Sequence, residues 1–282
     1  MVRRVTEIAN PMSALRELRD LALAIALEVA PIPANGQPRT HEARTFATST
    51  KSSEVDLVTA LDEATEAALT QAIARVRPQD GILGEEGAQS TGESGFTWVL
   101  DPIDGTVNYF YGLPQWAISV GIVDANGEPV VGVVHAPALG ETYVGARGEG
   151  AFLLSGGIRH ALTPPPEASL ELALLATGFS YDRKRREQMA AIFADLAPRV
   201  RDFRRAGAAS LDICAVAAGR INGYYERDLK PWDRVAAAAI AQEVGLTVKV
   251  SGDLMGHNLT IVAPSALAAT LERELTAFGI SD

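Results

Sequence analysis

The spacing of apolar positions predicts helices in the first part of the chain. Residues 13–30 repeat apolar side chains with the period of an amphipathic helix. Residues 31–50 are rich in Pro, Gly, Ser and Thr and are predicted to form a loop. A second helix is expected over 60–76, because Thr59 and Asp62 have the spacing of a capping box at its start.

The middle of the chain changes to short apolar segments that are typical of strands. Asp124–Glu128 separates two of them with a hairpin signal, so the segments predict a largely antiparallel sheet. Pro164–Pro166 interrupts the pattern, and we therefore divide the chain into domains 1–158 and 159–282. The expected strands of this part are 116–123, 130–135, 142–146 and 150–154.

Helices and strands alternate beyond that boundary. The expected helices are 183–197, 208–219, 232–244 and 265–277, and the expected strands are 172–176, 223–226 and 259–263. The 232–244 helix is alanine-rich and ends at Gly245. The whole pattern predicts an α/β or α+β protein with two subdomains.

Composition narrows the class of protein. The 282 residues are 47% hydrophobic, which suits one large or two moderate globular domains. A formal net charge of -10 argues against nucleic acid or acidic membranes as partners. The single Cys214 excludes intrachain disulfides and is expected to be buried. The chain shows no membrane-length apolar stretch and no secretory signal, since the apolar segment 21–29 contains Glu28, so we expect a cytoplasmic protein.

The most informative segment is Trp98–Asn108. An apolar run ends at Asp101, Pro102 prevents a regular strand ladder, and Asp104 follows beside a glycine. Two carboxylates this close repel each other unless a cation lies between them, which points to a divalent metal such as Mg²⁺ that takes oxygen ligands and bridges to phosphate. Asp-Pro and Asp-Gly are also ordinary turn signals, so this segment alone leaves a structural role open.

Other acidic residues stand at the ends of predicted elements. Glu85 and Glu86 follow an apolar pair, Asp233 begins a helix, and Asp56 precedes the expected cap at Thr59. Each has a structural alternative, namely solvated loop charges, compensation of the helix dipole, or a turn residue.

Taken together, these motifs resemble the inositol monophosphatase family. The matching segments, from about residue 15 to about 275, are Val55-Asp56-Leu57-Val58-Thr59 with Asp62, Gly84-Glu85-Glu86, Trp98 to Asn108, and Trp232-Asp233. The resemblance implies a layered αβαβα sandwich, hydrolysis of a phosphate monoester, about two to three Mg²⁺ ions per site, sensitivity to Li⁺ and a homodimer.

The resemblance also assigns roles to residues. The implied metal ligands are Glu85, Asp101, the Ile103 carbonyl, Asp104 and Asp233, with Asp101 bridging two ions. The implied catalytic residues are Asp56 and Thr106, which orient and deprotonate the attacking water, together with Glu85. Glu86 resembles an acid beside an outer metal, and the amides of Gly105 and Thr106 resemble a phosphate cradle.

The residues expected to bind the substrate match the family pattern less closely than the expected metal ligands do. Glu226 resembles the residue that accepts hydrogen bonds from substrate hydroxyls, although a strand-end charge is an alternative. Ala208 stands where the family usually has Ser or Thr, and Ser210 lies two residues on. The expected substrate-binding residues are Gly105, Thr106, Ala208, Glu226 and Asp233.

We therefore predict Mg²⁺-dependent hydrolysis of a small phosphorylated polyol, with inositol monophosphate as the expected substrate. Histidinol phosphate, fructose 1,6-bisphosphate and a phosphoadenosine are alternatives within the superfamily. A non-catalytic regulator that retains the fold is the alternative of a different class. The apolar segments 116–123 and 130–134 are the expected source of the dimer contacts.

Overall fold

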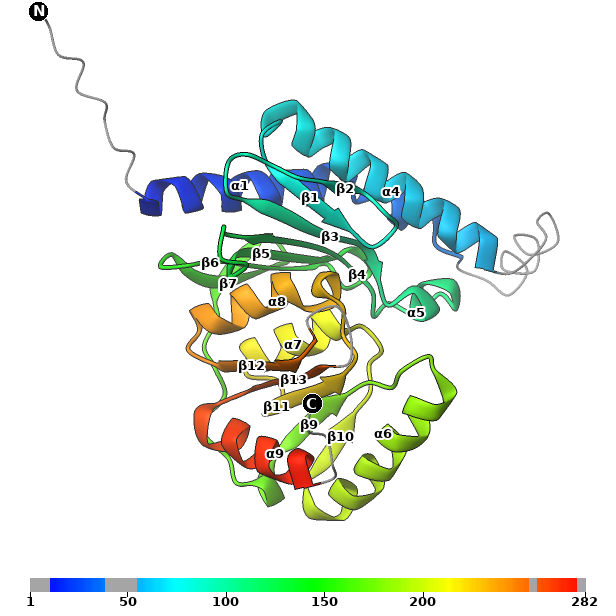
Figure 1. Ribbon diagram of the computed structural model, residues 1–282, viewed down its shortest axis with the longest axis vertical. Helices are drawn as coiled ribbons and strands as arrows, with labels where there is room; N and C mark the ends of the chain where they lie inside the picture. Colours follow the sequence, from blue (N-terminus) through cyan, green and yellow to red (C-terminus); the bar gives the residue numbers. More distant parts are fainter. Residues whose placement is uncertain (1–10, 39–54, 254–257, 278–282) are drawn as a thin grey trace, which may run out of the picture.

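Helical and sheet layers alternate along the long axis of the molecule (Figure 1). The computed structural model describes residues 11–38, 55–253 and 258–277, without the side chains of residues 11–13 and 55–59. The helical layers are α1 (Pro11–Val29) with α4 (Val55–Val76), α7 (Ala209–Ala217) with α8 (Pro231–Glu243), and α6 (Arg183–Leu196) with α9 (Ser265–Ala277). The two sheets lie between these layers, which confirms the predicted αβαβα sandwich.

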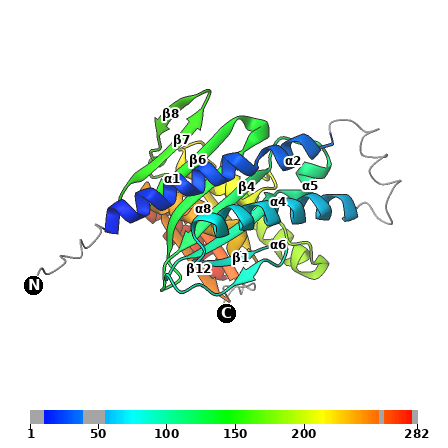
Figure 2. The same ribbon diagram turned by 90° about the horizontal axis from the view of Figure 1, so that it is seen from above.

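The first sheet has eight strands in the order β2-β1-β3-β4-β5-β6-β7-β8. Its strands are β1 (Gly81–Gly84), β2 (Gln89–Ser90), β3 (Thr97–Asp104), β4 (Ala117–Val123), β5 (Pro129–Ala136), β6 (Glu141–Ala146), β7 (Gly150–Ser155) and β8 (Ile158–Ala161). Only β1 and β3 pair in parallel, so the prediction of a largely antiparallel sheet is confirmed. Seen from above, α1 and α4 run across its outer face (Figure 2).

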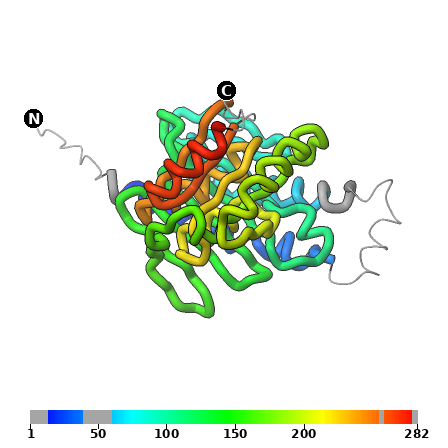
Figure 3. Tube along the Cα trace, turned by 90° about the horizontal axis from the view of Figure 1, so that it is seen from below, coloured from blue at the N-terminus to red at the C-terminus, as the bar shows by residue number. Residues whose placement is uncertain are grey.

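The second sheet has five strands in the order β10-β9-β11-β13-β12. Its strands are β9 (Leu174–Thr177), β10 (Asp202–Arg204), β11 (Gly223–Arg227), β12 (Thr247–Gly252) and β13 (Asn258–Ala263). β10, β9 and β11 are parallel, and β13 and β12 are added antiparallel. The view from below shows α6 and α9 over its outer face (Figure 3). The carboxyl ends of the three parallel strands therefore share one edge of the sheet.

Helix α8 packs unusually close to the first sheet because glycines face it. A Cβ on Gly132 of β5 would lie 1.9 Å from the Ala236 carbonyl oxygen of α8. A Cβ on Gly121 of β4 would lie 2.6 Å from Val235 Cγ1, and one on Gly145 of β6 would lie 3.0 Å from the Cα of Ile240. The sheet face and the alanine-rich helix thus fit backbone against backbone, which fixes where the amino end of α8 lies.

Two local predictions near the amino end are wrong. Residues Pro31–Gly36, within the expected loop, form a short helix α2, for which Pro31 and Pro33 are compatible because prolines are tolerated in a first helical turn. Helix α4 begins at Val55 rather than near residue 60, so the capping box of Thr59 and Asp62 does not start it. Asp62 lies inside the helix with 3% of its surface exposed.

Strand predictions failed where strands are short, irregular or without fully buried side chains. β3 continues through Asp101 to Asp104 instead of ending at Asp101, with a register shift against β4 between these two residues. The sequence analysis did not identify β1, β2, β8, β10 or β12. β8 and β10 are largely exposed, so they carry little of the apolar signal that marks a strand.

Two further observations concern the expected environment. Cys214 is buried and reduced, which confirms its expected packing role. Among the helices of the described residues, none is both long and apolar enough to cross a membrane.

Candidate active site

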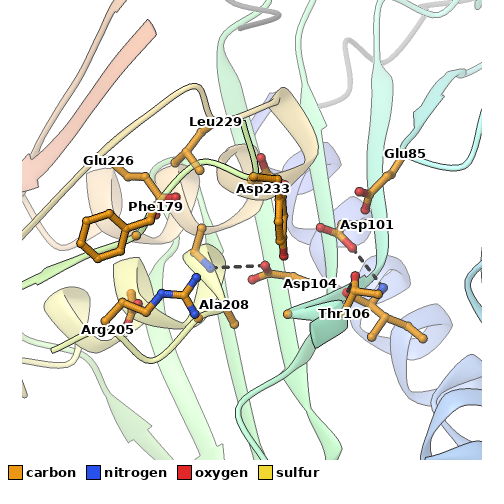
Figure 4. Close-up of a pocket in the computed structure, with 17 residues that line it drawn as sticks. Glu85, Asp101, Asp104, Thr106, Phe179, Arg205, Ala208, Glu226, Leu229 and Asp233 are labelled. Atoms are coloured by element: carbon orange, nitrogen blue, oxygen red, sulfur yellow. Dashed lines mark hydrogen bonds between the residues drawn. The ribbon is translucent and has the colours of Figure 1, made fainter. Parts of the chain in front are cut away.

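A pocket between the two sheets brings together most of the predicted site residues (Figure 4). Its walls include Glu85, Asp101, Ile103, Asp104, Gly105, Thr106, Ala208, Glu226 and Asp233. Glu86 is exposed beside the pocket and lines a groove along α4 instead. Asp56 falls within α4, but its side chain lies outside the described residues.

The irregular end of β3 presents its two carboxylates to the pocket. The register shift at Pro102 leaves the Ile103 N–H free of the ladder, and it donates to Asp101 Oδ1 at 3.0 Å. The Ile103 carbonyl accepts a hydrogen bond from Thr106 Oγ1 at 3.1 Å. Gly105 has a φ of 91° and begins the short helix α5 (Thr106–Phe110), a conformation that favours glycine.

A glutamate that the sequence analysis missed holds the Glu85 loop. Glu66 of α4 accepts the Glu86 N–H at 2.9 Å and the Ala88 N–H at 2.8 Å. A Cβ on Gly84 would lie 2.2 Å from Glu66 Oε2, so glycine is required for this contact. A side chain of α4 therefore holds the loop that carries Glu85 in position. The sequence around Glu66 contains no motif that indicates this role.

Backbone and hydroxyl donors hold Asp104 and Asp233. Ser210 donates to Asp104 Oδ2 from its N–H at 2.8 Å and from its Oγ at 2.5 Å. The Ala209 N–H donates to the other oxygen of Asp104 at 3.2 Å. Asp233, in the first turn of α8, accepts the Lys230 N–H at 2.6 Å. Ser210 thus supports Asp104 rather than replacing the hydroxyl missing at Ala208.

Burial raises the pKa of the acidic side chains of the pocket, and repulsion between several of them adds to it. Burial and repulsion from Glu85 hold the pKa of Asp101 well above its usual value, and burial and Asp104 do the same for Asp233. Desolvation, with repulsion from Glu86 and Asp104, raises the pKa of Glu85 to about 7 although Asp101 hydrogen-bonds to it. Burial raises the pKa of Asp104 to about 6 against the hydrogen bonds from Ser210 and Ala209.

This donor set fits a hard divalent cation. The side chains of Glu85, Asp101, Asp104 and Asp233 offer only carboxylate oxygens, and the Ile103 carbonyl adds a neutral oxygen. A cation among them would favour the charged carboxylates and so offset the burial and repulsion that raise their pKa values. As they stand, no three Asp, Glu, His or Cys side chains of the described residues are arranged closely enough to hold a metal ion, so binding requires the carboxylates to draw together.

Glu226 lies at the opposite end of the pocket from Thr106 (Figure 4). One of its oxygens accepts the Tyr224 hydroxyl at 2.5 Å. A Cβ on Gly178 would lie 2.0 Å from the same oxygen, so the glycine after β9 makes room for this carboxylate. Burial raises the pKa of Glu226 to about 7 despite the Tyr224 hydrogen bond.

Several pocket residues were missed by the sequence analysis. They are Gly178, Phe179, Tyr181, Gly207, Arg205, Ala209, Asp212 and Leu229. Gly178 and Arg205 each directly follow a strand, β9 and β10, and a strand-end rule for parallel sheets identifies such positions. Strand β10 carries no sequence signal, because two of its three residues are exposed, so the position of Arg205 at a strand end is not visible in the sequence.

A further buried acid, Asp212, also lines the pocket. It lies in α7, where burial followed by repulsion from Asp104 and Glu226 raises its pKa to about 8. It also accepts a hydrogen bond from the Ala206 N–H, which links α7 to the loop after β10. Asp62 has a similarly raised pKa of about 8, caused by burial and by the charges of Glu86 and Glu85.

Comparison with known proteins identifies the family of this chain. Residues 14–280 match the model of the inositol monophosphatase family. The inositol-1-monophosphatase SuhB of Mycobacterium tuberculosis is 43% identical over 234 residues, which span 79% of this chain and 80% of the relative. The Nus factor SuhB of Pasteurella multocida is 37% identical over 235 residues, 82% of this chain and 84% of the relative.

Solved structures agree with the sequence comparison. Mycobacterium tuberculosis SuhB superposes with a TM-score of 0.80 at 39% identity, covering 94% of this chain and 97% of that one. Inositol monophosphatase from Anabaena (Nostoc) sp. PCC 7120 superposes with a TM-score of 0.78 at 30% identity, with the same two coverages of 94% and 97%. Because the family model matches nearly the whole length of this chain, the chain belongs to the inositol monophosphatase family.

Proposed function

We propose that this protein hydrolyses the phosphate monoester of a small polyol in a Mg²⁺-dependent reaction, with inositol monophosphate as the substrate. One observation carries the proposal. A single pocket has four carboxylates and Thr106 at one end and Glu226 at the other. A phosphate ester bound with its phosphate at the acidic end would therefore place its alcohol part near Glu226.

The residues of the acidic end take the roles of metal ligands and water-positioning groups. Glu85, Asp101, the Ile103 carbonyl, Asp104 and Asp233 would hold the metal, and Glu86 would lie beside an outer ion. Bound Mg²⁺ would supply charge neutralisation for the phosphate dianion and for the leaving alkoxide. Thr106 and Asp56 would orient the attacking water and accept its proton, while the Gly105 and Thr106 amides contact phosphate.

Inositol monophosphate is favoured by the polyol end of the pocket and by relatives that carry the name inositol-1-monophosphatase. The Glu226 carboxylate suits hydroxyl groups, because it accepts hydrogen bonds and retains acceptor capacity beyond its bond to Tyr224. Ala208 contributes no hydroxyl, and histidinol phosphate, fructose 1,6-bisphosphate and a phosphoadenosine remain the alternative substrates.

A non-catalytic role is the alternative of another class, since relatives from Neisseria, Pasteurella and Vibrio carry the name Nus factor. The acidic end argues for catalysis, because burying Asp101 and Asp104 side by side is costly and a docking surface does not require it.

Our remaining proposals concern the setting of the enzyme. The expectation that 116–123 and 130–134 supply the dimer contacts is wrong, because these segments of β4 and β5 are almost entirely buried within the single chain, where α8 and α1 pack against them. We still propose a homodimer, a cytoplasmic location, subdomains 1–158 and 159–282, and neither nucleic acid nor membrane as a partner. The charge of -10 supports the last of these.

A phosphate-release screen over about twenty phosphomonoesters, with Mg²⁺ and with EDTA, tests the function. We expect turnover that EDTA abolishes and Mg²⁺ restores, inhibition by Li⁺, and a loss of about a thousandfold in Asp101→Asn because one carboxylate serves two ions. Turnover that survives EDTA unchanged would contradict the metal-dependent reaction, and absence of turnover on every ester would favour the non-catalytic role.

A further inference from the structure

The polyol end of the pocket is built at one edge of the second sheet. Phe179 follows β9, Arg205 follows β10, and Glu226 lies near the end of β11, so the parallel pairing of these strands brings the three side chains together. In Figure 4 the Arg205 guanidinium extends toward Ala208, on the far side of Asp104 from Glu85. The chain thus places a cation beside the Glu226 carboxylate.

The loop that carries Arg205 is held from several sides. The Asn108 amide donates to the carbonyls of Ala206 at 2.8 Å and Gln115 at 2.7 Å, which ties this loop to the loop of Asp104. A Cβ on Gly207 would lie 2.6 Å from Arg205 Nη1, so the guanidinium lies directly against the backbone of that residue. Arg205 is exposed, yet its position next to the pocket is set by fixed neighbours.

The adjacent arginine behaves differently and provides a natural comparison. Arg204 Nη1 contacts Asp202 Oδ2 at 2.6 Å and the Phe203 carbonyl at 2.7 Å, and it does not line the pocket. Among the described residues that line the pocket, Arg205 is the only lysine or arginine.

The chemistry of the three groups matches a hydroxylated ring. A guanidinium presents only donors, whereas the Glu226 carboxylate presents acceptors, so neighbouring hydroxyls of one ring can be bound from both sides. Phe179 offers an apolar surface for the C–H face of the ring, and its position is fixed by an edge contact with Phe193 at 6.0 Å between ring centroids. The donor missing at Ala208 is therefore available from Arg205.

We infer that Arg205 determines substrate specificity by donating hydrogen bonds to hydroxyls of the alcohol part, while Glu226 accepts them. This inference rests on the proposed phosphatase function. It adds to that function a residue with a defined role.

The test compares Arg205→Gln with wild type and with the matched control Arg204→Gln. The probes are inositol 1-phosphate and p-nitrophenyl phosphate, which lacks ring hydroxyls. In Arg205→Gln the KM for inositol 1-phosphate should rise about tenfold, while kcat/KM for the aryl ester stays within about twofold. Arg204→Gln should match wild type on both.

Two results would overturn the inference. They are an equal loss on inositol and aryl esters in Arg205→Gln, and no change on either ester. Failure of the phosphatase function is separate, because it abolishes wild-type turnover of every ester. In that case, calorimetric binding of inositol 1-phosphate decides: weaker binding by Arg205→Gln than by Arg204→Gln supports the inference, and equal binding overturns it.

Discussion

Ser210 donates two hydrogen bonds, from its backbone N–H and its hydroxyl, to the same carboxylate oxygen of Asp104. The two residues are far apart in the sequence. Asp104 is the last residue of β3, and Ser210 lies in the first turn of α7. This contact fixes the orientation of Asp104 and leaves its other oxygen to Ala209 and the pocket.

Removing the Ser210 hydroxyl should loosen Asp104. In Ser210→Ala we expect the Mg²⁺ concentration for half-maximal turnover to rise roughly tenfold, because groups that orient a metal ligand affect metal affinity by about that much. The measurement is phosphate release against Mg²⁺ concentration. Thr270→Ala, which removes a helix-surface hydroxyl in α9, is the control and should leave the curve unchanged. An unaltered Mg²⁺ requirement in Ser210→Ala would contradict the positioning role.

Thr106 should act mainly in the transition state. Its hydroxyl donates to the Ile103 carbonyl at 3.1 Å, which holds it at the acidic end of the pocket. We expect Thr106→Ala to lower kcat by about a hundredfold or more with a much smaller change in KM, as for loss of a proton-transfer partner. Thr106→Ser keeps the hydroxyl and should retain most activity. A rise in KM alone would assign Thr106 to substrate binding instead.

The closeness of Asp101 and Asp104 was predictable because its information is local. Asp101, Pro102, Asp104 and Gly105 are neighbours in sequence, and turn chemistry alone makes them an irregular strand end with two acids. The longer helices were predictable for a related reason, since their apolar period extends over several turns.

The supports of the site were not predictable because they are non-local. Glu66 acts on a loop 20 residues later, and Arg205 enters the pocket only because β10 pairs with β9. Asp62 has the spacing of a helix cap, yet tertiary packing buries it within α4. A single sequence does not show which distant segment will face such residues.

The glycine contact between β5 and α8 should control both stability and activity. In Gly132→Ala the new Cβ would lie 1.9 Å from the Ala236 carbonyl, so α8 must shift and carry Asp233 with it. We expect a loss of about 1–3 kcal/mol in unfolding free energy, typical of overpacking, and a fall in turnover. Urea denaturation and phosphate release measure the two effects.

Gly223→Ala is the matched control for this change. Gly223 is also a buried strand glycine without a positive φ, and its added Cβ would meet only side-chain atoms at 3.2 Å or more. It should cost less stability and leave turnover near wild type. If Gly132→Ala were as stable and active as Gly223→Ala, close packing of α8 would not be what positions Asp233.

An ion pair far from the pocket should govern part of the acid sensitivity of the fold. Asp80 is buried, and it accepts hydrogen bonds from Arg77 at 2.8 and 2.9 Å and from the Trp98 indole at 2.9 Å. Burial alone would raise its pKa, but the hydrogen bonds from Arg77, Ser94 and Trp98 outweigh burial and lower the pKa below the ordinary 3.8. The charged carboxylate is thus stabilised by folding.

The sign of the pH effect follows from that lowered pKa. The contribution of Asp80 is fully present above the ordinary value of 3.8 and is lost as the pH falls through the lower folded value. Raised acids such as Asp62 and Asp212 have the opposite effect, because their protonation at lower pH favours the folded state. The pH dependence of wild-type stability therefore combines contributions of opposite sign. The difference in unfolding free energy between wild type and Asp80→Asn isolates the contribution of Asp80.

We expect Asp80→Asn to lose roughly 1–3 kcal/mol of unfolding free energy at pH 7, as when a charged partner of buried hydrogen bonds is removed. This difference from wild type should shrink as the pH falls below 3.8. Urea unfolding of both proteins at pH 7, 5 and 3 measures it, and Glu28→Gln, which breaks the exposed pair with Arg75, is the control with a change of about 0.5 kcal/mol or less. A difference that stays constant down to the lowest pH would mean that Asp80 stabilises the fold through shape rather than through its charge.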